Sequence, residues 1–328
     1  MKVIIPLAGK GTRLRPHTHT KAKPLVNVAG KPVLAHILDS IKDRKDIDEI
    51  IFTTGHLGQQ IQDFVVDNYD FKSVFIEQKE LTGQSTAVKL AEGFVDKDVL
   101  IWFVDTISDP DLDRLTGLKG DGLIYVKEVA DPSRFGVVVT KGGKVTELIE
   151  KPDKPLSNLV NIGLYYVRDS KRLFDAINDQ IERKLQTHGE YYLMDAFQIM
   201  IDKGAVFEVE EVSVWEDCGK ADALLKTNRY FLDHGKSAEF KGAINSIIIP
   251  PVNIHPSAHI EKSIIGPYVS ISEKCRIHGS IIADSIINEG SAVDSARLKQ
   301  SVIGASALVK GVSKRLNVGD SSEIVFGG

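Results

Sequence analysis

Cysteine is scarce in this sequence, with only Cys218 and Cys275 among 328 residues. Two cysteines so far apart exclude a disulfide framework and a multi-cysteine zinc site, and we expect a reducing cytoplasm as the compartment. No apolar run is long enough to span a bilayer. The short apolar run 2–7 leads directly into a glycine loop, so we expect a first strand there and not a signal peptide.

Acidic residues are missing from the first 38 positions, although the chain as a whole has a net charge of −4. The first acid is Asp39, and it follows seven basic residues: Lys2, Lys10, Arg13, Arg15, Lys21, Lys23 and Lys31. The overall charge favours neither nucleic-acid nor membrane binding. A solvated basic loop is one interpretation of the local excess. The glycines and prolines within it favour a loop that binds an anion.

The first hundred residues alternate between apolar runs and helical patterns. Candidate strands are 2–7, 49–54, 73–78 and 99–104, and candidate helices begin at Pro32 and span 58–67 and 84–95. This alternation predicts a mostly parallel sheet with helices on both faces.

Beyond residue 104, apolar runs follow one another without long helices, which predicts a mixed or antiparallel part of the sheet. Helices are expected again at 170–183, 190–203 and 219–234, with a strand at 206–212 between the last two. The predicted fold class is therefore α/β, with a Rossmann-like mixed sheet over residues 1–234. The polar stretch 235–243 is interpreted as a linker.

A repeat occupies the last part of the chain. The triplet Ser-Ile/Val-Ile begins at Ser246, Ser263, Ser280 and Ser301, with an extra copy at Ser285. Apolar residues within it recur every six positions, as in Ile265, Ile271 and Ile277. Six-residue steps in coils of such length are typical of a parallel β-helix, so we predict about four coils in residues 244–328. Ordinary strands of a second sandwich are the alternative.

The most specific motif is the stretch LAGKGTRLRP at 7–16, which follows the first predicted strand. Glycines at 9 and 11 allow the backbone to approach phosphate oxygens, and the Arg13 guanidinium matches phosphate geometry. The spacing is not that of a P-loop. Leu14 occupies the third glycine position of a dinucleotide fingerprint. Downstream, Lys23 in the motif KPL can neutralise charge on a phosphoryl group.

These motifs, together with AGKP at 29–32, resemble the sugar-1-phosphate nucleotidyltransferase family. The family includes glucose-1-phosphate thymidylyltransferases and uridylyltransferases and mannose-1-phosphate guanylyltransferases. The resemblance continues through Gln78, Asp105, EKP at 150–152, NIGLY at 161–165 and WEDCG at 215–219, so it covers residues 1–234. It implies a nucleotidyltransferase domain followed by a short left-handed β-helix of hexapeptide repeats.

The resemblance also implies roles for individual residues. The implied nucleotide-binding residues are Leu7, Ala8, Gly9, Gly11, Thr12, Gln78 and Gly83. The implied catalytic residues are Arg13, Lys23 and Asp105. The implied sugar-phosphate-binding residues are Gly136, Glu150, Lys151 and Asn161. The implied ligands of a Mg²⁺ cofactor are Asp105 and Asp217.

The expected reaction is transfer of a nucleotidyl group from dTTP or UTP to a sugar 1-phosphate, with glucose 1-phosphate favoured. We expect a homo-oligomer formed through the β-helix. Guanylyl transfer to mannose 1-phosphate and a catalytically silent regulatory subunit remain as alternatives. A further alternative is a second, acyl-transferring activity of the β-helix, with His255, His259 or His278 as base.

Overall fold

The computed structural model describes residues 1–311 and 313–325. Residue 312 and residues 326–328, which the predicted β-helix domain includes, lie outside the described part. Contacts group the chain into two compact units, one of residues 1–9 and 39–215 and the other of residues 10–38 and 216–328. The predicted domain limits at 234 and 244 stay a prediction. In the described part of the chain, no helix has the length and apolar character needed to cross a membrane.

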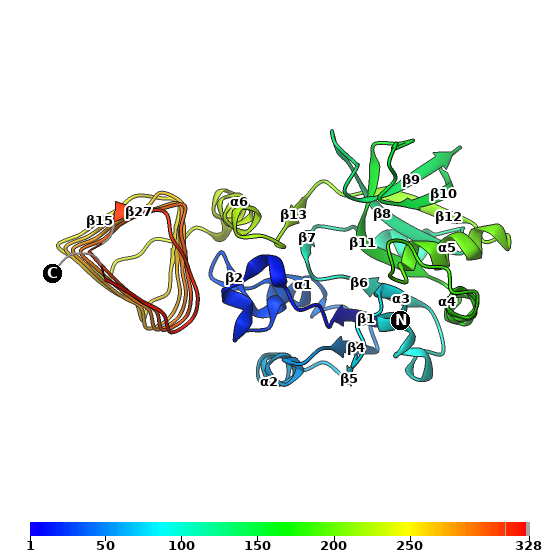
Figure 1. The fold of residues 1–328 in the computed structure, drawn as a ribbon, viewed down its shortest axis with the longest axis horizontal. Coiled ribbons are helices and arrows are strands. Elements are labelled where there is room, and N and C mark those ends of the chain that lie inside the picture. Colours follow the sequence, from blue (N-terminus) through cyan, green and yellow to red (C-terminus); the bar gives the residue numbers. More distant parts are fainter. Residues whose placement is uncertain (312, 326–328) are drawn as a thin grey trace. The chain divides into compact units, whose positions relative to one another are not determined.

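The first unit is built on a nine-stranded sheet in the order β5-β4-β1-β6-β11-β8-β12-β10-β9 (Figure 1). Its strands are β1 Lys2–Leu7, β4 Glu49–Thr54, β5 Ser73–Glu77, β6 Val99–Trp102, β8 Gly122–Glu128, β9 Gly136–Lys141, β10 Lys144–Glu150, β11 Leu159–Val167 and β12 Phe207–Glu211. The strands β5, β4, β1 and β6 run parallel, whereas β11 pairs antiparallel with β6 and β8. The expected mixed α/β fold is confirmed.

Helices cover this sheet because their apolar stripes need a partner surface. Among the residues that the structure describes, the α-helices are α1 Val33–Ile41, α2 Gly58–Asn68, α3 Gln84–Lys89, α4 Ser170–Glu182, α5 Leu193–Asp202 and α6 Ala221–Phe231, and α6 belongs to the second unit. A core cluster joins α3, α4 and α5 to the strands through Val88, Phe174, Phe197, Tyr165 and Ile101. The helix expected over 84–95 ends at Lys89 and is followed by a 3-10 turn at Glu92–Phe94 that contains Gly93.

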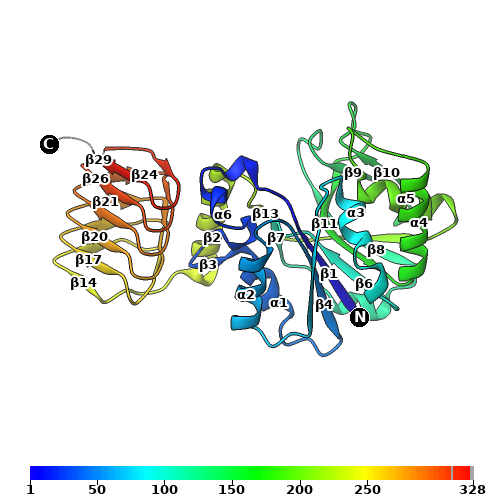
Figure 2. The same cartoon turned by 60° about the horizontal axis from the view of Figure 1, so that its bottom comes forward.

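The C-terminal strand stack (β14–β29) consists of short parallel strands in three sheets, and its coils form a triangle in Figure 1 and a pile in Figure 2. The first sheet contains β14 Ala243–Ile244, β17 His259–Glu261, β20 Arg276–His278, β23 Ala292–Asp294, β26 Leu308–Lys310 and β29 Glu323–Val325. The second contains β15 Ile247–Ile248, β18 Ile264–Ile265, β21 Ile281–Ala283, β24 Arg297–Lys299 and β27 Ser313–Lys314. The third contains β16 Val252–Ile254, β19 Val269–Ile271, β22 Ser285–Ile287, β25 Val302–Ile303 and β28 Asn317–Val318. This arrangement is consistent with a β-helix.

The serine triplets belong to two different sheets of the stack. Ser263 and Ser280 precede strands of the second sheet, whereas Ser285 and Ser301 belong to the third. Each of these hydroxyls accepts a backbone N–H from the next coil, as Ser280 does from Ala296 at 3.1 Å. Buried polar groups need such partners, so the serines mark inner corners and the isoleucines fill the core.

Residues 10–31 of the second unit, which we call the basic loop, contain only short elements. These are the 3-10 turns Thr12–Leu14, His17–His19 and Lys23–Leu25 and the strands β2 Asn27–Val28 and β3 Lys31–Pro32. The strands β2 and β3 pair antiparallel, with Asn27 opposite Pro32. Frequent Gly and Pro account for the short elements, because they interrupt longer helices and strands.

Candidate active site

One cluster of predicted site residues lies in the first unit where β9 and β10 meet β11. Gly136 begins β9 and is paired in register with Glu150 at the end of β10. A β carbon at position 136 would lie 2.2 Å from Asn161 Nδ2, 2.8 Å from a Glu150 carboxylate oxygen and 2.0 Å from the Met194 sulfur. The missing side chain of Gly136 therefore lets these three side chains converge.

Asn161 is oriented by several hydrogen bonds in this cluster. Its amide nitrogen donates to the Gly136 carbonyl oxygen at 3.2 Å, and its amide oxygen accepts from the Gly163 N–H at 3.2 Å. The hydroxyl of Tyr165 also donates to the amide oxygen. The orientation of the amide is thus determined before any ligand binds.

Glu150 and Lys151 form a charged pair at the end of β10. The Glu150 side chain is 8% exposed, and burial raises the pKa of its carboxyl despite the nearby Lys151 ammonium. The Lys151 ammonium lies 2.7 Å from the Tyr192 hydroxyl oxygen and 3.5 Å from a Glu150 oxygen. Burial lowers the Lys151 pKa, but the Tyr192 hydrogen bond and the Glu150 charge outweigh it and raise the pKa overall. Lys151 is 40% exposed, so its charge stays available to an anion.

Sequence reasoning missed the contribution of residues 189–195 to this cluster. The sequence predicts a helix over 190–203, and α5 begins at Leu193. Its first turn carries Met194 to Gly136, and the preceding Tyr192 holds Lys151. Asp195 accepts a hydrogen bond from Thr187 at 3.0 Å, and burial raises its pKa. Tyr192, just before the start of α5, was the available signal in the sequence. Its partner Lys151 lies 41 residues away in the chain, so the contact could not be predicted.

Gln78 and Gly83 lie together at the end of β5. The Gln78 amide nitrogen donates to Thr86 Oγ1 at 3.2 Å and to the Gly83 carbonyl oxygen at 3.4 Å. At Gly83, φ is +139°, and a β carbon would lie 2.5 Å from the backbone nitrogen and oxygen of Tyr191. Glycine is therefore required at 83 for close backbone packing.

Three predicted residues lie at the end of β1, and Asp105 lies after β6. Leu7 and Ala8 are buried, while Gly9 is exposed. A β carbon on Gly55 would lie 2.7 Å from the Ala8 carbonyl oxygen, so the loop after β4 packs directly on this strand end. Asp105 is half-buried in the turn between β6 and β7 Thr106–Ser108. The expected strand at 99–104 is two residues shorter, ending at Trp102.

The second unit brings together further predicted residues. Gly11 has a left-handed backbone with φ +62°, and a β carbon there would lie 3.0 Å from Lys23 Cβ and Thr18 Cγ2. The Thr18 hydroxyl donates to the Gly11 carbonyl oxygen at 2.7 Å. Thr12 and Arg13 follow Gly11 in a 3-10 turn and are exposed. The glycine loop is thus folded against the stem of Lys23.

Arg13 also lies close to Asp217, at the end of β13 Trp215–Asp217. A β carbon on Gly219 would lie 2.9 Å from Asp217 Oδ1 and 3.1 Å from Arg13 Nη2. The Gly219 N–H donates to Asp217 Oδ1 at 2.6 Å, and the Thr227 hydroxyl of α6 donates to the Asp217 carbonyl oxygen at 2.9 Å. Asp217 is exposed but anchored at its backbone.

Among the described residues, no group of three or more His, Cys, Asp or Glu side chains could hold a metal ion. The histidines considered for a second activity have local partners. His278 Nδ1 lies 3.1 Å from an Asp294 oxygen, and His255 Nδ1 lies 2.8 Å from the Ser257 hydroxyl. His259 is exposed on β17.

The mixed nine-stranded sheet with helices packed on it defines an α/β protein. The chain belongs to the nucleotidyl transferase family, whose model matches residues 2–234.

Full-length and partial relatives agree with this assignment. The bifunctional protein GlmU of Methanocaldococcus jannaschii is 35% identical over 250 residues, which are 76% of this chain and 58% of that protein. The chain thus spans less than two thirds of that relative. The low-salt glycan biosynthesis nucleotidyltransferase Agl11 of Haloferax volcanii is 32% identical over 99% of both chains. The glucose-1-phosphate thymidylyltransferase of Streptomyces antibioticus is 32% identical over 94% of this chain and 93% of its own.

A solved structure of a putative glucose-1-phosphate thymidylyltransferase from Bacillus anthracis, in complex with sucrose, is also similar. It has a TM-score of 0.59 and 28% identity, and covers 74% of this chain and 97% of its own.

Proposed function

We propose that this protein transfers a nucleotidyl group from dTTP or UTP to a sugar 1-phosphate, preferably glucose 1-phosphate, and releases pyrophosphate. The observation that carries the proposal is the convergence of Gly136, Glu150 and Asn161 from three strands, beside the half-exposed Lys151. Buried polar groups next to one cation suit a ligand with hydroxyls and a phosphate. The names of the two thymidylyltransferases reported above support a thymidylyl donor and glucose 1-phosphate as the acceptor.

In the proposed reaction, an oxygen of the sugar phosphate attacks the α-phosphorus of the nucleotide. The bond from that phosphorus to the bridging oxygen breaks, and pyrophosphate leaves with the electron pair. The attacking phosphate is already ionised at neutral pH, so no general base is required. The obstacle is repulsion between two polyanions, and catalysis therefore consists of positioning and charge stabilisation.

We assign roles on this basis. Lys151 binds the sugar phosphate, while Glu150 and Asn161 bind sugar hydroxyls. Arg13 holds the triphosphate, and Lys23 stabilises charge on the α-phosphoryl group. The loop residues Leu7, Ala8, Gly9, Gly11 and Thr12 provide the backbone around the nucleotide.

Gln78 is the proposed base-reading residue. Its amide hydrogens point to Thr86 and Gly83. Its amide oxygen is therefore the atom we assign to the imide N–H of thymine or uracil.

Asp105 and Asp217 are the proposed carboxylate ligands of a Mg²⁺ whose coordination is completed by substrate oxygens. Mg²⁺ is commonly bound by one or two carboxylates together with phosphates and water, and Asp105 and Asp217 supply two carboxylates. When bound, the ion would neutralise phosphate charge.

The strand stack is proposed to be left-handed and to mediate self-association. In its second sheet Ile247, Ile264 and Ile281 are in register, and Ile247 and Ile281 are 58% and 42% exposed. An apolar column of this kind favours contact with a second copy of the chain. Ile281→Lys should lower the mass in light scattering, whereas Leu156→Lys, at the 66% exposed Leu156, should not. An unchanged mass would contradict the proposed interface.

The proposed function is tested by a matrix of nucleoside triphosphates against sugar 1-phosphates, with pyrophosphate release as the readout. Turnover with GTP and mannose 1-phosphate alone would establish the guanylyltransferase alternative, and no turnover would favour a regulatory subunit. Lys23→Ala and Asp105→Asn should each reduce turnover about 100-fold or more. Lys171→Ala and Asp175→Asn, which alter an exposed ion pair of α4, are the controls. Normal turnover in both active-site variants would refute the assigned roles.

A further inference from the structure

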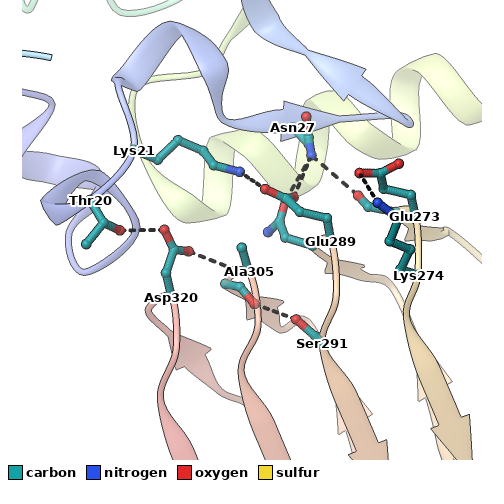
Figure 3. A network of polar contacts seen from close by, with 12 residues as sticks. Thr20, Lys21, Asn27, Glu273, Lys274, Glu289, Ser291, Ala305 and Asp320 are labelled. Carbon is teal, nitrogen blue, oxygen red and sulfur yellow. Dashed lines mark hydrogen bonds and ion pairs between the residues drawn. The ribbon is translucent and has the colours of Figure 1, made fainter. Parts of the chain in front are cut away.

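The basic loop lies against one edge of the strand stack within the second unit (Figure 3). That edge carries a column of equivalent residues in successive coils, which we call the corner column: Glu273, Glu289, Ala305 and Asp320. Backbone hydrogen bonds establish the equivalence. Gly290 donates to the Glu273 carbonyl, Ser306 to the Glu289 carbonyl and Ser321 to the Ala305 carbonyl. Three of the four positions are acidic.

Two of the three acidic members of the corner column, Glu289 and Asp320, contact the basic loop directly. The Lys21 ammonium forms an ion pair with Glu289, and the two side chains are only 20% and 33% exposed. The Thr20 hydroxyl donates to Asp320 Oδ2 at 2.5 Å. The other Asp320 oxygen accepts from the Ala305 N–H at 2.8 Å, so the aspartate is fixed to the stack while it holds the loop.

Further contacts between the basic loop and the strand stack lie on both sides of these two. His17 Nε2 lies 2.6 Å from Asn317 Oδ1. The amide nitrogen of Asn27 lies 3.2 Å from Asn288 Oδ1. A β carbon on Gly319 would lie 2.9 Å from Pro16 Cβ, so the loop approaches this coil too closely for a side chain at 319.

The helix α6 also contacts both the basic loop and the strand stack. The buried Asn228 accepts from the Ala29 N–H at 3.0 Å and from the Ser270 hydroxyl at 2.6 Å through one oxygen. Arg229 forms a two-fold hydrogen-bonded ion pair with Asp284 of the stack. The loop is therefore attached to the stack at several points between residues 16 and 29.

We propose that the strand stack is the positioning element of the nucleotide-binding loop, with Glu289 and Asp320 as the positioning residues. The proposal rests on the proposed function, which assigns the triphosphate to this loop. The reason is electrostatic and entropic. The six lysines and arginines of the basic loop, which contains no acid, repel one another, and acids supplied by the stack offset that repulsion. A loop held in its binding conformation then loses less entropy when the triphosphate binds.

The corner column also contains a position for a matched control variant, Glu273. Glu273 occupies the position one coil before Glu289, but its carboxylate lies 3.8 Å from the ammonium of Lys274 in its own coil. Glu273→Gln removes the same charge from the same column as Glu289→Gln. A general effect of stack charge or stability would appear in both variants, and a positioning effect only in the second.

The experiment uses the full chain and varies the nucleoside triphosphate. In Glu289→Gln, the KM for the nucleoside triphosphate should be about fivefold higher than in wild type. In the double variant Glu289→Gln/Asp320→Asn, this KM should be higher still. The KM for sugar 1-phosphate and kcat should change less than about twofold. Hydrogen exchange of peptides from residues 10–31 should become faster in the same variants and not in Glu273→Gln.

A charge swap separates positioning from damage to the fold. Lys21→Glu alone should raise the nucleotide KM, and adding Glu289→Lys should restore most of the affinity, because the ion pair is rebuilt with reversed signs. An unchanged nucleotide KM despite faster loop exchange would overturn the proposal. An equal increase of the nucleotide KM in Glu289→Gln and in the control Glu273→Gln would also overturn the proposal.

Failure of the proposed function gives a different pattern. A wild-type protein without pyrophosphate release in the substrate matrix would refute the function. Calorimetric titration with dTTP or UTP, alone and with Mg²⁺, would then replace KM in the comparison of Glu289→Gln with Glu273→Gln. Equal affinity in those two variants would refute the positioning role.

Discussion

Gly136→Ala is the substitution that most directly tests the sugar-side cluster. The new methyl group would lie 2.2 Å from Asn161 Nδ2 and 2.8 Å from a Glu150 oxygen. Both distances are far below van der Waals contact, so side chains must move. Met194, whose sulfur would lie 2.0 Å away, has the freedom to move, but Asn161 is held by hydrogen bonds to Gly136 and Gly163.

The magnitude follows from these contacts. Overpacking of this kind costs about 1–3 kcal/mol of unfolding free energy. Displacement of Asn161 or Glu150 would remove one or two hydrogen bonds to the sugar, each worth about 0.5–1.5 kcal/mol. We therefore expect the KM for sugar 1-phosphate to rise about tenfold, the equivalent of about 1.4 kcal/mol, while the nucleotide KM changes less than about twofold.

The assay is steady-state pyrophosphate release with each substrate varied in turn, combined with urea denaturation. Gly93→Ala is the control, because a β carbon at position 93 would meet nothing within 4 Å. A folded Gly136→Ala protein with a wild-type KM for sugar 1-phosphate would refute the assignment of this cluster to the sugar.

Three further predictions concern pH, reactivity and the strand stack. Burial raises the pKa of Glu150, so its contribution to stability is present below the ordinary glutamate pKa and is lost as pH rises through the folded value. Glu150→Gln removes this loss. In urea denaturation, the stability of the variant relative to wild type should increase as pH rises above the ordinary glutamate pKa of about 4, and a constant difference would contradict this. Burial raises the pKa of Cys275 to about 11, so an aromatic disulfide reagent should modify it only after unfolding, and rapid labelling of the native protein would refute that expectation. Ser280→Ala leaves the Ala296 N–H without its partner, and should cost about 1–3 kcal/mol of unfolding free energy. Ser246→Ala, in the first coil of the stack, should lower the unfolding free energy by less. Equal losses of unfolding free energy in the two variants would contradict the argument from burial.

Local sequence patterns predicted the elements well where burial dictated the residues. The run 2–7 is β1, and its neighbour at 49–54 is β4, because strands buried on both faces require continuous apolar residues. The serine and isoleucine repeat predicted stacked coils for a similar reason. The shift of Ser285 and Ser301 to a different sheet could not be predicted, because coil spacings of 17 and 16 residues both occur in the stack.

By itself the sequence determined the alternation of strands and helices, the repeat, and the excess of positive charge in residues 1–38. These are local properties, governed by side-chain period, glycine conformation and charge density. Only the tertiary structure decided that Tyr192 holds Lys151 and that Glu289 holds Lys21. The paired residues are 41 and 268 positions apart in the chain. Such contacts arise from the packing of whole elements, and no periodicity along the chain encodes them.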